Sequence, residues 1–501
     1  MPLSIALPIA LPKVLKTPSL WLTLAAALAG CSTAPPYQRP AMEMPASFRE
    51  AAAQPAAATP VPDDWWRLFN DPALDALQAQ VAIGNENLKA SVAQYRAAQA
   101  ALAGSRGALL PSFGLGLDAS RSGSGSSRST SSTGNGNNNS SAGSVGNSVS
   151  LTGSASWEVD LWGRLSGQVD TAQARLQASR DDLAAAELSV RATLAQTYFS
   201  LRAAEAQTAL LQDTLTAYQR SLDLTQNRYQ AGVASAADVA QAQNQLKSTQ
   251  AQLIESRSSR AQFEHALAVL LGRPPGLFDL GNTATLPMAP DAPPQLPAQL
   301  LERRPDIAAA ERRVAAANAQ VGVARAAFFP ALTLSASAGY RGSTLANLVS
   351  APNLFWSLGP ALALTAFDGG QRQAAVDSAR AGVDQAAASY RQTVLTALQE
   401  VEDNLVIAAS LQEETGVLAE ALTAARRALD VTTNQYRAGT VSYLNVVSAQ
   451  TAVLSAERSL LDVRSRRLAA IAQLLKNVAG RWDLPPAALQ SGGPAPTLRA
   501  P

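Results

Sequence analysis

The stretch Asn227-Arg228-Tyr229-Gln230-Ala231-Gly232-Val233 occurs in this chain a second time, as Asn434-Gln435-Tyr436-Arg437-Ala438-Gly439-Thr440. The same offset relates Leu215 and Leu222 to Leu422 and Leu429. A repeat of this size is much longer than the ~20–50 residues of a solenoid unit. We therefore interpret the chain as one pseudo-symmetric molecule made of two related halves.

Each copy of this stretch follows a long heptad pattern. In the first copy, apolar and small residues recur every seven positions along a predicted helix from Leu165 to Gln230, which is roughly 100 Å at 1.5 Å per residue. A return helix is expected from about Ala237 to Leu271. The second copy predicts the same pair, one helix reaching Arg437 and the other ending near Val478. Sustained heptads indicate packed, supercoiled helices.

A predicted β-hairpin precedes each helix pair. In the first, Phe113, Leu115 and Leu117 alternate with glycine and polar residues, and a tract rich in Ser, Gly and Asn (residues 121–147) forms a long exposed loop. The hairpins are expected at residues 112–161 and 331–367. A shorter helix is expected before each one, from Asp71-Pro72 to about Leu110 and from Pro305 to about Phe328.

Four alternating strands per chain leave backbone N–H and C=O groups at the edges of the sheet that need hydrogen-bond partners. In a bilayer the strands must close into a barrel, and such barrels start at about eight strands. Two chains would give eight strands and three would give twelve, which leaves room for a passage. The alternatives are a hairpin at the edge of a soluble sandwich, and helices that form a solid coiled coil without a pore.

The N-terminus has the layout of a signal peptide. Lys13 and Lys16 precede a short apolar run that ends in Leu28-Ala29-Gly30-Cys31. This ending resembles the bacterial lipobox, which implies cleavage before Cys31 and lipidation of that cysteine. Cys31 is the single cysteine, so an internal disulfide is excluded. The alternative is a buried cysteine in an ordinary N-terminal helix.

Charge and motif content exclude several classes of function. The chain has 40 basic and 38 acidic side chains, and two of the lysines lie in the signal peptide. This balance gives no reason to expect nucleic acid as a partner. His265 is the only histidine, and neither a metal-ligand spacing nor a catalytic motif is present. We expect no enzymatic activity, no metal and no cofactor apart from the lipid on Cys31.

The expected organisation has six parts. They are a signal peptide (1–30), a lipidated leader (31–70), a first repeat (71–271), a Pro-rich linker (272–299), a second repeat (300–480) and a C-terminal tail (481–501). The first repeat holds the hairpin at 112–161 and the helix pair at 165–271; the second holds the hairpin at 331–367 and the helix pair at 371–478.

Two further stretches carry a family resemblance. Leu300-Leu301-Glu302-Arg303-Arg304-Pro305-Asp306-Ile307 and Gly322-Val323-Ala324-Arg325-Ala326-Ala327-Phe328-Phe329-Pro330, with the lipobox, Trp65-Trp66 and the two Tyr-x-x-Gly turns, resemble the OprM/NodT branch of the TolC family. The resemblance implies an α+β outer-membrane lipoprotein of a Gram-negative bacterium, assembled as a homotrimer. Its twelve-stranded β-barrel, four strands per chain, would continue as a helical barrel in the periplasm. The implied partners are outer-membrane lipid, a periplasmic membrane-fusion adaptor and an inner-membrane RND-type pump.

The resemblance also assigns candidate site residues at the two turns. The periplasmic tips, which would contact the adaptor, comprise Gly232, Val233, Ser235, Gly439, Thr440 and Ser442; the alternative is that these residues only cap helices. TolC has acidic gate residues after its second turn, whereas the matching positions here are the neutral Asn445 and Ser448. The first turn retains an acid at Asp238, which would form a ring or a tie between helices, or would only begin a helix.

These features predict a passive exit duct of a tripartite efflux pump for drugs or toxic compounds. The alternatives are an exit duct for type I protein secretion and a non-conducting, lipid-anchored periplasmic scaffold. The sequence does not specify the transported substrate.

Overall fold

A computed structural model describes residues 35–43, 45, 48–49, 62, 64–123, 145–291 and 304–478. The signal peptide, Cys31 and the tail after residue 480 lie outside the described residues. The chain divides into two compact units. Met1–Arg39, Ala98–Leu176 and Arg313–Ala386 form the first, here the strand unit, and Pro40–Ala97, Gln177–Arg312 and Ala387–Pro501 form the second, here the helix unit.

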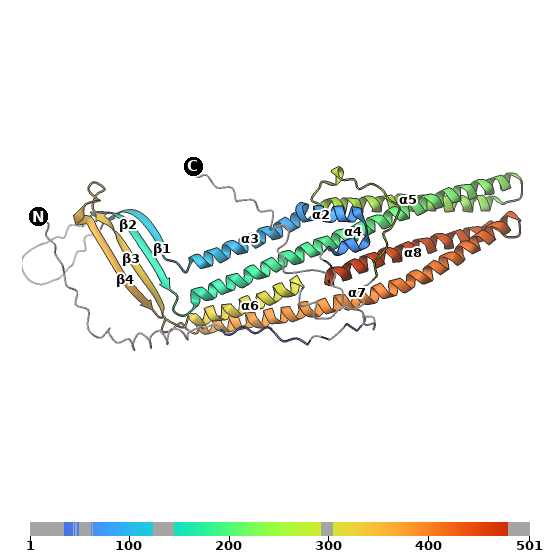
Figure 1. Cartoon of the computed structure of the whole chain (residues 1–501). Helices are drawn as coiled ribbons and strands as arrows, with labels where there is room; N and C mark the ends of the chain where they lie inside the picture. Colours follow the sequence, from blue (N-terminus) through green and yellow to red (C-terminus); the bar gives the residue numbers. More distant parts are fainter. Residues whose placement is uncertain are drawn as a thin grey trace, which may run out of the picture. The chain divides into compact units, whose positions relative to one another are not determined.

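The strand unit contains one antiparallel four-stranded sheet in the order β1-β2-β3-β4 (Figure 1). The strands are β1 (Ser112–Gly123), β2 (Val145–Val159), β3 (Ala331–Gly342) and β4 (Leu354–Ala363). Both predicted hairpins are present, and β2 pairs with β3 to join them. The expected loop at residues 121–147 is shorter than predicted, because β1 and β2 continue into it and pair Gly123 with Val145.

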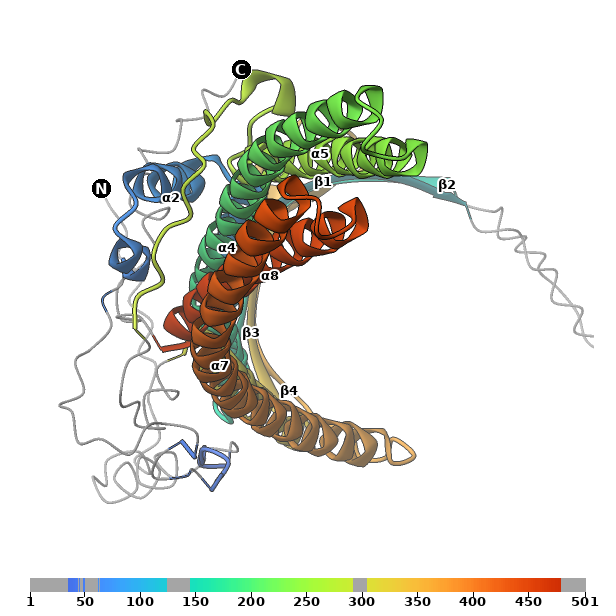
Figure 2. The same cartoon turned by 90° about the vertical axis from the view of Figure 1, so that its right-hand side faces the viewer.

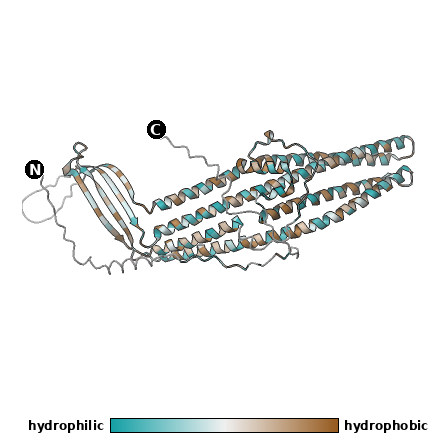
Figure 3. Cartoon of the chain, in the orientation of Figure 1, coloured by the Kyte–Doolittle hydropathy of each residue, from teal (hydrophilic) through white to brown (hydrophobic). Residues whose placement is uncertain are grey.

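The two faces of this sheet differ in chemistry, and the strands in Figure 3 show the alternation as brown and teal bands. One face, here the apolar face, carries large exposed side chains such as Phe113 and Leu115 on β1 and Trp356 and Leu358 on β4, each more than 70 % exposed. The other face, here the polar face, carries mainly Gly, Ser and Thr of the intervening positions. Strict alternation produces this division because successive side chains point to opposite sides of a strand.

Four helices have residues in both units: α3 (Glu86–Gly107), α4 (Arg164–Gln230), α6 (Pro305–Ala326) and α7 (Gln371–Arg437). The helix unit also contains α2 (Pro72–Gly84), α5 (Ala236–Leu270) and α8 (Tyr443–Val478), so that α4–α5 and α7–α8 form two helical hairpins. The bounds of both hairpins agree with the heptad predictions to within a residue or two. Among the described helices, none combines the length and the hydropathy needed to cross a membrane.

The single helix expected from Asp71 to Leu110 is wrong, because Asn85 divides it into α2 and α3. Asn85 has extended backbone angles, and its side-chain oxygen accepts a hydrogen bond from Leu88 N at 2.9 Å, which caps α3. Its Nδ2 donates to the carbonyl of Leu270 at 2.7 Å. A capping side chain and a contact with the end of α5 therefore override the local helical propensity.

The described core of the helix unit gathers where α2 packs against α4, α5 and α8. Trp65 and Phe69, in a 3-10 helix (η2, Trp65–Phe69) before α2, are buried with Phe199 of α4. Asp71 caps α2 through Ala73 N and accepts a 2.6 Å hydrogen bond from the Tyr198 hydroxyl. Burial and this carboxylate both raise the pKa of Tyr198 well above its ordinary value.

Candidate functional site at the paired helical turns

The turns after α4 and α7 have the same backbone geometry. Gly232 and Gly439 both have positive φ, 75° and 79°. In the first turn Gly232 N donates to the carbonyl of Tyr229, and Val233 N donates to the carbonyl of Arg228. In the second turn Gly439 N donates to the carbonyl of Tyr436, and Thr440 N donates to the carbonyl of Gln435. This is the hydrogen-bond pattern of a Schellman motif, and glycine reaches its left-handed position without strain. Both glycines are therefore helix caps.

The two turns lie side by side, as Figure 2 shows from the end of the hairpins. Arg228 of α4 donates from Nη1 to the carbonyl of Arg437 at 3.2 Å. Its guanidinium also lies 4.8 Å from the ring centre of Tyr436. Tyr436 in turn meets Tyr443 of α8 edge to face, with ring centres 5.4 Å apart. A cation and two aromatic rings thus hold the α4 turn against the α7 turn.

A second layer of contacts supports this bridge. The Tyr443 hydroxyl is 3.0 Å from Ser221 Oγ on α4, and the Tyr218 hydroxyl donates to Gln450 O on α8 at 3.3 Å. Tyr218 and Tyr443 are both buried, in a cluster with apolar residues of all four helices. Burial raises the pKa of each of these two phenols, so they stay neutral at physiological pH. The bridge is therefore backed by an uncharged, packed interface.

The predicted tip residues lie at the surface around this bridge. Val233 is 63 % exposed, and Gly232, Gly439, Thr440 and Ser442 are also exposed. The described tip also exposes Leu444, 59 %, and Tyr229, 50 %. These three apolar side chains are open to solvent at the ends of the two hairpins.

The gate candidates are placed differently from one another. Asp238 forms a capping box with Ser235: Ser235 N donates to Asp238 Oδ2 at 2.9 Å, and Asp238 N donates to Ser235 Oγ at 3.1 Å. The helix-start interpretation of Asp238 is thus confirmed, and its part in a ring or a tie stays a prediction. Asn445 and Ser448 are exposed on α8, where they also stay predictions.

Tyr229 and Tyr436 occupy equivalent positions of the sequence repeat, but their surroundings differ. Tyr436 is 5 % exposed and Tyr229 is 50 % exposed. The bridge residues Arg228, Tyr436 and Tyr443 were all missed as site residues. A signal was available, because the positions equivalent to Arg228 and Tyr443 in the other repeat hold Gln435 and Ala236. The bridge residues Arg228 and Tyr443 are thus present in one repeat only.

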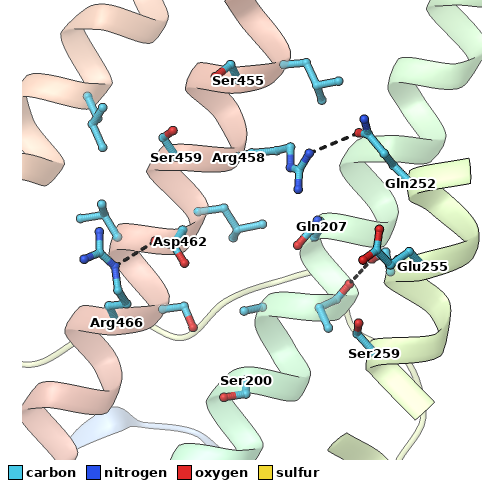
Figure 4. Close-up of a pocket in the computed structure, with 18 of the residues that line it drawn as sticks. Ser200, Gln207, Gln252, Glu255, Ser259, Ser455, Arg458, Ser459, Asp462 and Arg466 are labelled. Atoms are coloured by element: carbon cyan, nitrogen blue, oxygen red, sulfur yellow. Dashed lines mark hydrogen bonds and ion pairs between the residues drawn. The ribbon is translucent and has the colours of Figure 1, made fainter. Parts of the chain in front are cut away.

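Further along the same hairpins, a polar groove of about 820 Å³ opens between α4, α5, α7 and α8 (Figure 4). Arg458 of α8 reaches across to Gln252 of α5 at 3.3 Å. Arg466 pairs with Asp462 at 2.8 Å and approaches Glu414 of α7 at 3.6 Å. These ion pairs and the hydroxyls beside them give the groove a polar lining. The described residues include no cluster that could hold a metal ion.

Comparison with known proteins identifies the family. Residues 77–273 and 296–480, most of the chain, match the family described as "Outer membrane efflux protein". The chain belongs to this family. Among its relatives, this efflux protein is 31 % identical to the outer membrane protein OprJ of Pseudomonas aeruginosa, over 92 % of this chain and 95 % of OprJ. It is also 31 % identical to the toluene efflux pump outer membrane protein TtgF of Pseudomonas putida, over 94 % and 98 %.

Solved structures give the same result for the fold. The outer-membrane channel OprN superposes with a TM-score of 0.80 at 31 % identity, over 90 % of this chain and 99 % of OprN. The open state of the MtrE channel of Neisseria gonorrhoeae superposes with a TM-score of 0.77 at 28 % identity, over 90 % and 98 %. The efflux protein is thus an outer-membrane channel of the TolC type and the outer-membrane component of an efflux pump. The apolar face of its sheet suits that location.

Proposed function

We propose that the efflux protein is a passive exit duct that works as a homotrimer. Three four-stranded sheets close into a twelve-stranded barrel, and the helical hairpins of the three chains enclose the periplasmic part of the passage. A periplasmic membrane-fusion adaptor docks on the paired turns and couples them to an inner-membrane RND-type pump, which supplies the energy. The protein itself catalyses no reaction.

The open edges of the sheet support the trimer. β1 and β4 each pair with one described neighbour only, so each leaves one row of backbone groups unpaired. Such groups are costly in a bilayer unless another strand satisfies them. Exposed apolar residues also occur along α7, namely Leu395, Val417 and Val431. Both features are satisfied when the β1 edge of one chain meets the β4 edge of the next.

The contact between the two turns is the observation that carries the proposed regulation. Arg228 joins the α4 turn to the α7 turn through one hydrogen bond and one cation–π contact. Together these are worth about 1–2 kcal/mol. An adaptor that binds the exposed tip residues better in the separated state can overcome an energy of this size. Asp238, Asn445 and Ser448 would then face the opening between the hairpins.

Lipidation of Cys31 would anchor the leader in the membrane, and it is the one covalent modification that the proposal requires. The described part of the leader lies against the strand unit shortly after this cysteine, where Asn318 Nδ2 of α6 donates to Pro35 O at 2.9 Å. For the cargo we propose small drugs or toxic compounds, since relatives are named for toluene, antibiotic and pyoverdine transport.

Single-channel recording in planar bilayers tests the duct and its regulation together. Arg228→Gln installs the residue of the second repeat and removes the bridge, so we expect it to raise the open probability about tenfold, as 1–2 kcal/mol implies. Arg437→Gln is the matched control, because Arg437 accepts from Arg228 through its backbone carbonyl, and among the described residues its own side chain bonds only Asn434. A trimer that never conducts, even as Arg228→Gln, would refute the duct and favour a scaffold.

Deletion in the native host tests the cargo. We expect greater susceptibility to several small toxic compounds and unchanged secretion of proteins. Loss of a secreted protein without a change in susceptibility would instead support a secretion duct.

A further inference from the structure

The polar face of the sheet contains one large apolar side chain among many small ones. Over β1 to β4, the residues on this face are mainly Gly, Ser, Thr and Ala, and Phe355 of β4 is the only aromatic residue there. Phe355 is half-buried, whereas Trp356 and Leu358 on the apolar face of the same strand are exposed. Its surroundings therefore call for a specific explanation.

Arg341 of β3 supplies part of that explanation. Phe355 is opposite Gly339, and Arg341 lies two residues further along β3, on the same face. The Arg341 guanidinium is 5.1 Å from the centre of the Phe355 ring. Gly339 cannot be replaced without strain, because a Cβ there would meet Leu151 O at 2.0 Å. The backbone thus leaves the ring and the cation side by side and partly exposed.

No described carboxylate pairs with Arg341, in contrast to the other end of the same face. There Glu158 binds Arg164 through two hydrogen bonds of 2.8 and 2.6 Å. Arg341 shares a cross-strand row with Ser150 of β2 and Asp118 of β1. Asp118 is therefore two strands away, and among the described residues no ion pair joins its carboxylate to Arg341. The guanidinium keeps hydrogen-bond donors available.

We propose that Arg341 and Phe355 form a binding position for amphipathic organic anions on the inner wall of the channel. A guanidinium binds a carboxylate or sulfonate through paired hydrogen bonds, and the adjacent ring contacts an aromatic or other apolar body. This inference rests on the proposed trimer, in which the apolar face meets lipid and the polar face lines the lumen. The position lies at the end of β3 remote from α6, on the outward part of the wall.

Weak binding is what a duct requires at such a position. A solute must bind well enough to enter and weakly enough to leave. The cation–π contact at an exposed site is worth only about 0.5–1 kcal/mol. An anion that binds the guanidinium in place of the ring therefore loses little free energy by breaking this contact. The pair would favour anions that carry a ring over small hydrophilic anions of the same charge.

Block of the single-channel current by 2-naphthalenesulfonate tests the position, with acetate and benzyltrimethylammonium as comparison ions. All variants are made in the Arg228→Gln background and recorded as trimers in planar bilayers, with the probe added on the outward side. We expect Arg341→Gln to raise the half-blocking concentration of the sulfonate about tenfold. Phe355→Leu should raise it several-fold, and Arg341→Lys should fall between wild type and Arg341→Gln, since lysine keeps the charge without the planar fork.

Two substitutions on the apolar face are the matched controls. Arg121→Gln removes an equal charge from the outward part of β1, and Phe113→Leu makes the same change of ring to aliphatic side chain. Neither should alter block. Equal effects of Arg341→Gln and Arg121→Gln, or equal effects on sulfonate and acetate, would overturn the binding position. Absence of any current would refute the proposed duct instead, so the two failures are distinguishable.

Discussion

Arg228, Tyr443 and Ser221 join the two helical hairpins, and each occupies a position where the other repeat has a different residue. Their equivalents are Gln435, Ala236 and Ala428. The contacting side chains occupy non-equivalent positions of the repeat: Arg228 meets Tyr436, whose counterpart is Tyr229, and Ser221 meets Tyr443. Only one repeat carries Arg228, Ser221 and Tyr443 at these positions, so the second repeat lacks the groups that would form the same contacts.

Gly84 permits a close approach of two backbones in the helix unit. A Cβ at Gly84 would meet Leu271 O at 2.1 Å, and one at Gly272 would meet Gly84 O at 2.1 Å. We predict that Gly84→Ala lowers the free energy of unfolding by about 1–3 kcal/mol, as overpacking does, measured by denaturation in detergent. Gly104→Ala is the control, since nothing lies within 4 Å of that site in α3. Equal effects of both substitutions would contradict the close approach.

Asp306 links stability to pH through its contact with Arg304. Burial acts to raise the pKa of the Asp306 carboxyl, but the hydrogen bonds and charge of Arg304, 2.7 Å away, outweigh it and lower the pKa below its ordinary value. The stability that this pair contributes is therefore complete above about pH 4, the pKa range of an unfolded aspartate. It is lost as the pH falls through the lower, folded pKa.

We predict that Asp306→Asn makes the melting midpoint less dependent on pH below about pH 4. Thermal melts from neutral to acid pH would measure this. Asp377→Asn serves as the control, because Asp377 pairs with Arg380 at the surface, where both side chains are more than half exposed. If the acid dependence of Asp306→Asn matched that of wild type, the Arg304 pair would not be its source.

At the scale of elements, the long helices and the strands followed from periodicity alone. Seven-residue spacing continues through α4 and α7 because their packing partners run alongside them, and alternation along β1 to β4 reflects two unlike environments. The division between α2 and α3 was not predictable in this way. Asn85 is compatible with a helix, and the break depends on its contact with Leu270, which is distant in sequence. The bridge at the turns was missed for the same reason.

We expect the same substitution to have different effects on folding at the two faces of β4. Leu358 lies on the apolar face opposite Ala336, and the adjacent Ser357 lies on the polar face opposite Ser337. An arginine facing lipid is unfavourable by about 2–4 kcal/mol near the middle of a bilayer. We predict that Leu358→Arg sharply reduces folded protein in the outer membrane, and that Ser357→Arg is tolerated, as measured by membrane fractionation and heat-modifiable gel mobility. Equal tolerance would contradict the assignment of the apolar face to lipid.

At the scale of the whole molecule, a single chain leaves its sheet incomplete. β1 and β4 lie at opposite edges of the four-stranded sheet, and both helical hairpins end in exposed turns. Closure therefore has to come from further copies, and the number of copies fixes the strand number and with it the width of the passage. Two copies would give eight strands, whose interior is filled by side chains, whereas three would give twelve.

Cross-linking between edge strands counts these copies. Cys31 is the only native cysteine, so cysteines placed at Leu117 of β1 and Leu358 of β4 are new, accessible thiols on the apolar face. A bifunctional thiol reagent that spans about 10 Å, two strand spacings, should link neighbouring chains and give a gel ladder that ends at the trimer. Cysteines at Leu151 and Tyr340, which face each other on β2 and β3, should link only within one chain and give monomers. A ladder that ends at the dimer would establish an eight-stranded assembly. A ladder that continues past the trimer would mean that the edges do not close. The last band of the ladder therefore decides between a narrow barrel, a barrel with a passage and an open sheet.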